Sequence, residues 1–278
     1  MLDLCPKTTV MLFKRFLLVV LVSISFYGTR AQRTTLNSPD KNLELGFWLN
    51  DKGTAMYELS YKGKPVVLPS SLGFDLKRTM TDEALPTLKE GLTVTGAVKT
   101  SNDSKWKPVW GDVKEIRDNY NELTANLQQP YSLLFRVYND GVAYRIVTKL
   151  KDSIIIKNEK AVFAFEKGKK ILLPLIGPGQ RTDKFHTSFE ELYQLKTVDS
   201  LTTQSFAYSP VLLGSGDEVK VAITESDLED YPGMFLTGSN TNQLKGKFAP
   251  YPLKEKMTEG GYQQYLVTER ANYIAKTK

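Results

Sequence analysis

Hydrophobic and polar residues alternate along this chain over short stretches that end in turn residues. Runs of Val, Ile, Leu, Phe and Tyr are interrupted by Gly, Asn, Asp and Pro, and apolar residues rarely recur at helical spacing. Alternation with a period of two is typical of strands that bury one face. The pattern therefore predicts strands over most of the chain that follows its N-terminal leader.

The clearest element is a hairpin. Residues 131–138 and 142–150 alternate on either side of Asn139-Asp140-Gly141, which provides the positive φ angles that a tight turn needs. Two more turns, at 50–53 and 62–65, predict a three-stranded meander. Further strands are expected near 92–99, 121–127, 154–157, 161–165, 206–213, 219–224, 233–237 and 262–267.

The number and spacing of these strands decide the fold class. Strands at roughly 8 to 12-residue spacing, without alternating helices, favour two packed antiparallel sheets over a parallel α/β sheet. We predict an all-β fold, one large antiparallel β-sandwich over residues 32–244. Short helices are expected at 188–192 and at 226–229, where Thr224 or Ser226 could cap a turn.

The first residues resemble a targeting signal rather than part of the fold. Lys14 and Arg15 precede an apolar run at 16–27, and small residues lead up to Ala31. A membrane span needs ~20 apolar residues, and this run is shorter. We predict a signal peptide over residues 1–31, a secreted, periplasmic protein, and no membrane anchor after cleavage. Met11 is the expected start of translation, because a polar leader rarely precedes the basic region of a signal peptide.

Charge and cysteine content narrow the classes of function. Removing the leader would lower the formal net charge from +6 to +3, and the short "KGKK" at 167–170 is no nucleic-acid footprint. We therefore expect no nucleic-acid partner. The only cysteine, Cys5, lies in the leader, so the mature chain would have no disulfide and no thiolate metal site.

Most catalytic motifs are missing. The chain has one histidine, His186, which by itself is more typical of a structural side chain, and no G-x-S-x-G elbow. "GPGQRT" at 177–182 lacks the residues of a phosphate-binding loop, and we interpret it as a turn.

Two stretches concentrate chemistry. "WKPVWGDVKEIRDNYNEL", at 106–123, holds Trp106, Trp110 and Tyr120, whose rings could stack on sugars or fill the sandwich core; composition favours the core. "VAITESDLEDYPGMFL", at 221–236, would place the carboxylates of Glu225, Asp227 and Glu229 on one side of a strand. Ca²⁺ suits such oxygen ligands, but the D-x-D-x-D-G pattern is absent, so spacing alone favours a solvated loop.

These two stretches, together with "FRVYNDGVAYRIV", "FHTSFEELY" and "VTERANYIAKTK", occur in an order that resembles the N-terminal domain of glycoside hydrolase family 97. The resemblance covers residues 37–278. It implies a β-super-sandwich similar to galactose mutarotase, of the kind that precedes a (β/α)8 barrel in periplasmic α-glucosidases and α-galactosidases of Bacteroides-type bacteria. Residues 245–278 would then be an exit segment leading to a barrel.

The resemblance also implies a site. Ca²⁺ would be held mainly by barrel glutamates, and Glu225 would join them from the sandwich. Glu190, Glu191 and Tyr231 would lie at the junction, with an exposed apolar surface beside Glu225 and Tyr231. The general acid and its partner carboxylate, which such hydrolysis requires, have no counterpart among these residues, so we expect the chain alone to be inactive on α-linked oligosaccharides.

Two other functions stay open. The sandwich could be a stand-alone oligosaccharide-binding module that uses Trp106, Trp110 and Tyr120. Fold analogy also suggests that the chain is an aldose epimerase. This argument is weak, because proteins with unrelated activities share folds, and the residues around His186 do not match those of such an enzyme.

Overall fold

The computed structural model describes residues 33–78, 89–151, 153–177, 183–186, 188–257 and 265–277. The predicted signal peptide lies outside these residues. The described part is all-β and its only helical segment is one 3-10 turn, η2 (Val198–Ser200). No helix within these ranges is both long enough and apolar enough to cross a bilayer.

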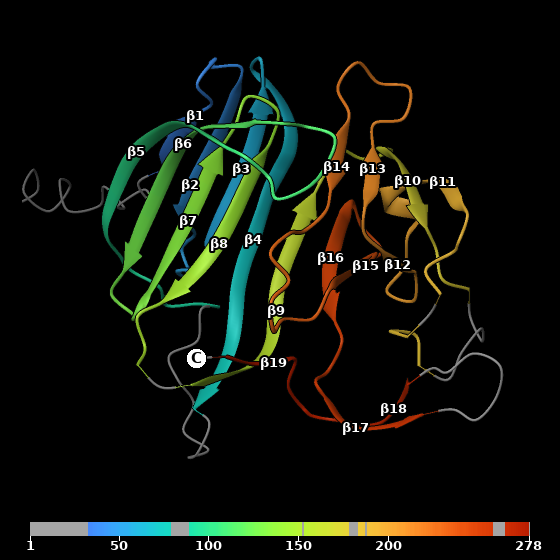
Figure 1. The fold of residues 1–278 in the computed structure, drawn as a ribbon. Helices are drawn as coiled ribbons and strands as arrows, with labels where there is room; N and C mark the ends of the chain where they lie inside the picture. The colour runs from blue at the N-terminus through green and yellow to red at the C-terminus, as the bar shows by residue number, and fades with distance from the viewer. Residues whose placement is uncertain are drawn as a thin grey trace, which may run out of the picture. The chain divides into compact units, whose positions relative to one another are not determined.

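One long antiparallel sheet organises the fold (Figure 1). Its strands follow the order β1 (Thr34–Asn37), β2 (Leu43–Leu49), β3 (Ala55–Tyr61), β4 (Lys64–Arg78), β9 (Ile154–Ala164), β16 (Gln243–Phe248), β15 (Met234–Thr237) and β12 (Phe206–Tyr208). A short strand, β19 (Ala275–Thr277), also pairs with β9.

Smaller antiparallel sheets complete the fold. One contains β5 (Val94–Trp106), β6 (Ile116–Leu127), β7 (Tyr131–Val137) and β8 (Val142–Thr148), in that order. Another contains, in order, β11 (Tyr193–Thr197), β10 (Lys170–Pro174), β13 (Val211–Leu213) and β14 (Val221–Ile223). The hairpin of β17 (Pro252–Met257) and β18 (Tyr265–Arg270) stands apart from both.

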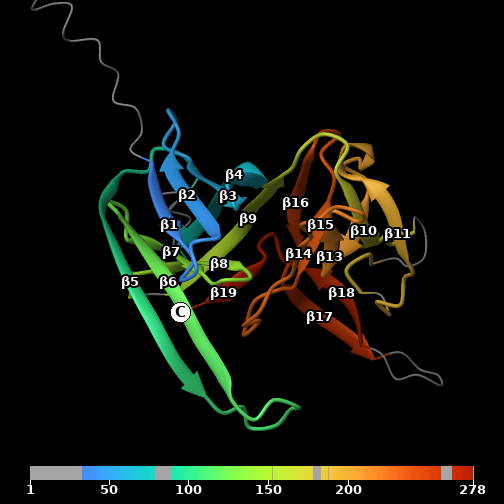
Figure 2. The ribbon, with the colours of Figure 1, turned by 90° about the horizontal axis from the view of Figure 1, so that it is seen from above.

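The β5–β8 sheet covers the β1–β4 part of the long sheet. The sheet of β11, β10, β13 and β14 lies beside β12, β15 and β16 (Figures 1 and 2). Inward-facing residues of facing sheets meet: the rings of Phe47 and Phe135 lie 5.3 Å apart. The buried side chains of both halves form one contiguous hydrophobic cluster. The Tyr57 hydroxyl, buried in that core, donates to the carbonyl oxygen of Val162 at 2.9 Å. The predicted β-sandwich is therefore confirmed.

Local turn chemistry explains the confirmed hairpins. β7 and β8 are joined where expected, and the Tyr138 amide donates to the Gly141 carbonyl at 2.8 Å. Gly53 and Gly63 have φ angles of 70° and 75°, a region that glycine enters without the penalty of a Cβ atom. They end the two turns of the predicted β2–β3–β4 meander.

The two expected helices are wrong. Residues 188–192 and 226–229 are irregular. Phe189 and Asp227 have φ angles of 57° and 62°, and a residue in this left-handed region cannot continue a right-handed helix.

Other expected boundaries also differ in the structure. The strand predicted at 206–213 is two strands, β12 and β13, which belong to different sheets. The strands predicted at 154–157 and 161–165 are parts of one strand, β9, that also includes the polar residues between them. The predicted exit segment begins within β16, and residues 245–277 contribute β17, β18 and β19, of which β19 returns to pair with β9.

Candidate functional site

The acidic loop, residues 224–233 between β14 and β15, carries the charges singled out in the sequence. β14 ends at Ile223, so the carboxylates follow the strand and do not share one of its faces. The half-buried side chain of Glu225 reaches across the loop, and its Oε1 atom accepts the backbone N–H of Met234 at 2.6 Å. This bond fixes one carboxylate oxygen of Glu225 at the start of β15.

A second anchor of the acidic loop is a cluster of tyrosine and glutamate side chains. The Tyr231 hydroxyl donates to Oε2 of Glu159 at 2.6 Å, and the Tyr144 hydroxyl donates to Oε1 of the same carboxylate at 3.4 Å. The Tyr144 ring packs on the ring of Tyr57 at 6.3 Å. We call Tyr57, Tyr144, Glu159 and Tyr231 the tyrosine–glutamate cluster.

Burial controls the protonation of this cluster. Because burial disfavours the charged form, it raises the pKa of Glu159 to about 7, although both hydroxyl donors favour the carboxylate. The negative charge of Glu225 raises that pKa further. The pKa of Glu225 itself is raised by burial, against the opposing effect of the Met234 amide. Burial also holds the pKa values of Tyr144 and Tyr231 above their ordinary value, so both stay hydroxyl donors.

The third anchor is an ion pair at the surface. The Arg145 guanidinium, on β8, contacts the Asp227 carboxylate. Asp227 and Asp230 have φ angles of 62° and 52°, a conformation that short polar side chains tolerate better than most. The acidic loop is thus held to β8, β9 and β15, and Glu225 has a defined position although it lies in an irregular segment.

The residues present fit Ca²⁺ only as part of a shared site. Among the described residues, no group of three or more His, Cys, Asp or Glu side chains could hold a metal ion. Ca²⁺ takes six to eight oxygen ligands. Within the same ranges the second carboxylate oxygen of Glu225 makes no recorded hydrogen bond, so this chain could offer it as one donor, and other ligands would have to come from elsewhere.

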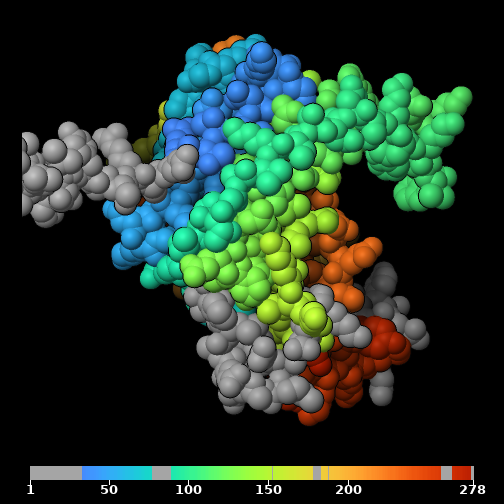
Figure 3. Space-filling view, turned by 90° about the vertical axis from the view of Figure 1, so that its left-hand side faces the viewer, coloured from blue at the N-terminus to red at the C-terminus, as the bar shows by residue number. Residues whose placement is uncertain are grey.

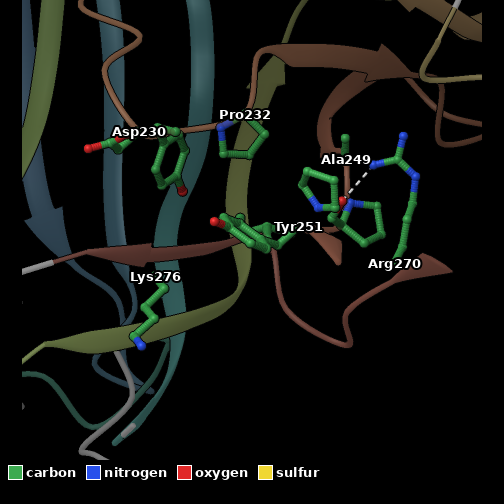
Figure 4. Close-up of a pocket in the computed structure, with 10 residues that line it drawn as sticks. Asp230, Pro232, Ala249, Tyr251, Arg270 and Lys276 are labelled. Atoms are coloured by element: carbon green, nitrogen blue, oxygen red, sulfur yellow. Dashed lines mark hydrogen bonds between the residues drawn. The ribbon is translucent and has the colours of Figure 1, made fainter. Parts of the chain in front are cut away.

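An open pocket of about 430 Å³ lies beside the acidic loop (Figure 4). It is lined by Asp230, Tyr231, Pro232, Ala249, Pro250, Tyr251, Pro252, Arg270, Ile274 and Lys276. Arg270 forms a rigid wall, because it donates to the Pro250 carbonyl at 2.6 Å and pairs with Asp183. The Tyr251 ring stacks on that of Tyr273 at 5.5 Å and stays partly exposed. Charged side chains line this pocket as well as proline and tyrosine rings, so the contiguous apolar surface expected beside Glu225 and Tyr231 stays a prediction.

The three aromatic candidates for sugar contact lie outside the acidic loop and its anchors. Trp106 and Trp110 are exposed at one end of the β5–β6 hairpin, so the interpretation of these two as core residues is wrong. Tyr120 packs on Tyr138 at 5.3 Å and under the Arg136 guanidinium at 4.3 Å. Its ring is thus partly used within the fold.

Glu190 and Glu191 precede β11, in the other half of the sandwich. The Glu191 amide donates to the Tyr208 hydroxyl at 2.9 Å, and no recorded interaction links either carboxylate to Glu225. Of the predicted residues, the structure therefore brings together Glu225 and Tyr231 alone.

Sequence reasoning missed Glu159, Tyr144 and Tyr251. Glu159 sits in "KNEKA", a polar interruption that was interpreted as a gap between strands. The available signal was the short length of that gap, because a bulged strand can continue through three polar residues.

Comparison with known proteins shows which family the sequence of this chain matches. The model of the family described as "Glycosyl-hydrolase 97 N-terminal" matches residues 36–267. A retaining alpha-galactosidase of Bacteroides thetaiotaomicron is 33% identical over 266 residues, which is 94% of this chain and 38% of that protein. The chain thus spans little more than a third of this curated relative.

Solved structures share the fold. A glycoside hydrolase family 97 enzyme of Pseudoalteromonas sp. strain K8, in complex with acarbose, matches 79% of this chain and 32% of its own, with a TM-score of 0.65 and 22% identity. A beta-arabinopyranosidase matches 88% of this chain and 40% of its own, with a TM-score of 0.66 and 20% identity.

The protein is therefore of the class of β-sandwich domains found in glycosidases. The chain belongs to glycoside hydrolase family 97, and residues 36–267 correspond to the N-terminal domain of that family.

Proposed function

We propose that this sandwich packs on the catalytic domain of a family 97 α-glycosidase and completes its active site by presenting Glu225 to a Ca²⁺ ion. The observation that carries the proposal is the triple anchoring of the acidic loop, through Arg145, Glu159 and Met234. A surface loop with no positioning role would not need a buried tyrosine–carboxylate bond. Held in this way, Glu225 can offer its second oxygen without losing conformational freedom on binding.

When bound, Ca²⁺ would supply positive charge for catalysis. The residues of this chain supply position. Tyr231 holds the loop through Glu159, the Met234 amide orients the Glu225 carboxylate, and burial around both groups strengthens their electrostatic interactions. Substrates would be α-linked oligosaccharides.

The test is a chimaeric protein in which residues 33–277 replace the matched N-terminal part of the Bacteroides α-galactosidase. Glu225→Gln should lower Ca²⁺-dependent turnover of an aryl α-galactoside by about 100-fold or more, because it removes a charged metal ligand. Glu229→Gln is the matched control, since Glu229 is exposed on the same loop. Unchanged Ca²⁺ dependence in Glu225→Gln would contradict the proposed role.

The isolated chain provides a second test. It should be inactive on aryl α-glucosides and α-galactosides with Ca²⁺ present, because we place the paired carboxylates of such hydrolysis on the partner domain. Turnover within about a hundredfold of the intact relative would show that the chain has its own catalytic machinery.

A second candidate function is oligosaccharide binding by the sandwich itself, favoured by the Tyr251 ring in the pocket. Aromatic faces can stack on sugar rings. Calorimetric titration of the isolated chain with maltotriose separates the two proposals. Binding that Tyr251→Ala abolishes would support the second, and no binding agrees with the first. An epimerase rests on fold analogy alone, which is a poor guide to activity.

We also propose that the protein is exported to the periplasm. N-terminal sequencing of the protein from a periplasmic extract should begin at Gln32, since cleavage is expected after Ala31. A mature protein that retains the leader would overturn this proposal.

A further inference from the structure

The end of the β5–β6 hairpin extends beyond its sheet. β6 pairs with β7 only from Asn121 onwards, while residues 116–120 pair with β5 alone, up to the Trp106–Ile116 pair. We call residues 102–120 the β5–β6 arm. Figures 2 and 3 show this arm, in green, projecting from the rest of the molecule.

Polar contacts within the arm hold its two strands in register. Arg117 donates two hydrogen bonds to Asp103, both at 2.7 Å, and Lys105 pairs with Glu115 at 2.7 Å. Arg117 also lowers the pKa of Asp103, so that carboxylate stays charged. A bidentate arginine–carboxylate pair fixes geometry better than a single contact does. These contacts keep the two strands of the arm in one register.

The tip of the arm is apolar and uncovered. Val109 is 100% exposed and Trp110 is 88% exposed, and Trp106 and Val113 are each more than half exposed. A two-stranded ribbon is marginally stable in water without a surface to pack on. Exposed apolar side chains gathered within one short segment of a polar element typically mark an interaction site.

The arm points to the same side of the sandwich as the acidic loop. In Figure 2 both segments, green and orange, extend towards the lower edge of the view, and in Figure 3 the arm projects above the orange atoms on the same side. A partner that reaches Glu225 from this side would therefore meet the arm as well.

We propose that the β5–β6 arm is a docking element that grips the catalytic domain, with Val109 and Trp110 packed against the surface of that domain. This inference rests on the proposed function, which supplies the partner. The aliphatic side chains of Val109 and Val113 favour a polypeptide over a sugar, because they offer no hydrogen bond to a hydroxyl group. The relatives contain a polypeptide that could cover the arm. This chain matches only 38% of the α-galactosidase, so most of that protein lies outside its sandwich domain.

The experiment measures how accessible the tip is. Val109→Cys places a thiol at the fully exposed position, and the only natural cysteine of the chain, Cys5, lies outside residues 33–277. Val98→Cys is the matched control, because Val98 is also an exposed valine of β5, at 53%, but lies outside the arm. Each variant is treated with a maleimide, in the isolated chain and in the chimaera, and labelling of the two peptides is followed by mass spectrometry.

We expect the thiol at position 109 to react at least about tenfold more slowly in the chimaera than in the isolated chain, and the thiol at position 98 to react at the same rate in both. Equal rates at position 109 would overturn the docking role. This outcome is independent of the proposed function: protection of position 109 in a chimaera whose activity ignores Glu225→Gln would keep the arm and reject the calcium role.

A second variant tests whether the contact contributes affinity. Trp110→Ser should separate the unfolding of the two domains of the chimaera into distinct calorimetric transitions, because aromatic anchors at the centre of an interface carry much of its energy. Val98→Ser should leave the thermogram unchanged, because Val98 lies on β5 outside the arm. A Trp110→Ser chimaera that unfolds like its parent would overturn the inference.

Discussion

The tyrosine–glutamate cluster and the β5–β6 arm use the same kinds of side chain in opposite surroundings. In the cluster, aromatic rings enclose the carboxylate of Glu159, and burial changes its pKa. In the arm, Trp110 and Val109 lie in solvent, and the nearby ion pairs are exposed. Side chains enclosed by the sandwich stabilise it, whereas those left in solvent contribute to stability only when a partner covers them. The comparison predicts where a substitution will affect folding and where it will affect assembly.

The largest effect is expected in the core next to the cluster. Phe135→Ala should lower the free energy of unfolding by about 3–5 kcal/mol, because Phe135 is 1% exposed and its removal leaves a cavity against Phe47. Urea denaturation of the isolated chain measures this loss. A loss below about 1 kcal/mol would mean that the core collapses around the site and would weaken the comparison.

An intermediate effect is expected from the charge of Glu159. Its pKa is about 7 in the folded protein and near the ordinary value of 4.5 in the unfolded chain, so folding binds a proton between these values. The stabilising contribution is complete below pH 4.5 and is lost as the pH rises through 7, by on the order of 3 kcal/mol.

Glu159→Gln should flatten this dependence, because the amide mimics the protonated carboxyl group. The residual slope should come from Glu225, whose pKa is raised as well. Unfolding free energies measured from pH 4 to pH 8 give both slopes. The control is Glu229→Gln, and a parental slope in the Glu159 variant would show that Tyr144 and Tyr231 stabilise the ionised form instead.

The smallest effect on stability is expected in the arm. Trp110→Ser in the isolated chain should change the free energy of unfolding by less than about 0.5 kcal/mol, because the indole ring is 88% exposed. The same urea titration measures it. A loss greater than about 1 kcal/mol would show that the arm packs on its own sandwich, and the contrast between the two regions would fail.

Local sequence signals predicted the parts of the fold that depend on local interactions. The β7–β8 hairpin was predictable because Gly141 follows two turn-forming residues between alternating strands. The helix expected at 226–229 failed because Asp227 takes a left-handed conformation while its carboxylate contacts Arg145, more than eighty residues away in the chain. No pattern of neighbouring residues contains that contact.

The candidate site was predictable in part for the same reason. Glu225 was singled out through the family resemblance of one short segment, and its role as a ligand stays a prediction. Glu159 could not be found in this way, because its importance comes from Tyr231 and Tyr144, which reach it from separate strands and loops. Trp110 was misjudged because composition says which side chains can be buried, and only the pairing of β6 shows that the end of this hairpin leaves the sheet.

The shared strand β9 has a consequence for cooperativity. It pairs with β4 on one side and with β16 and β19 on the other, so it belongs to both halves of the sandwich. Separating the halves would break main-chain hydrogen bonds along a central strand, and those groups would lose their partners in the interior. The two halves should therefore unfold together, with no hinge between them. A domain without a hinge keeps the distance between the base of the arm and Glu225 constant, so a partner that binds both, as we propose, would be aligned as it docks.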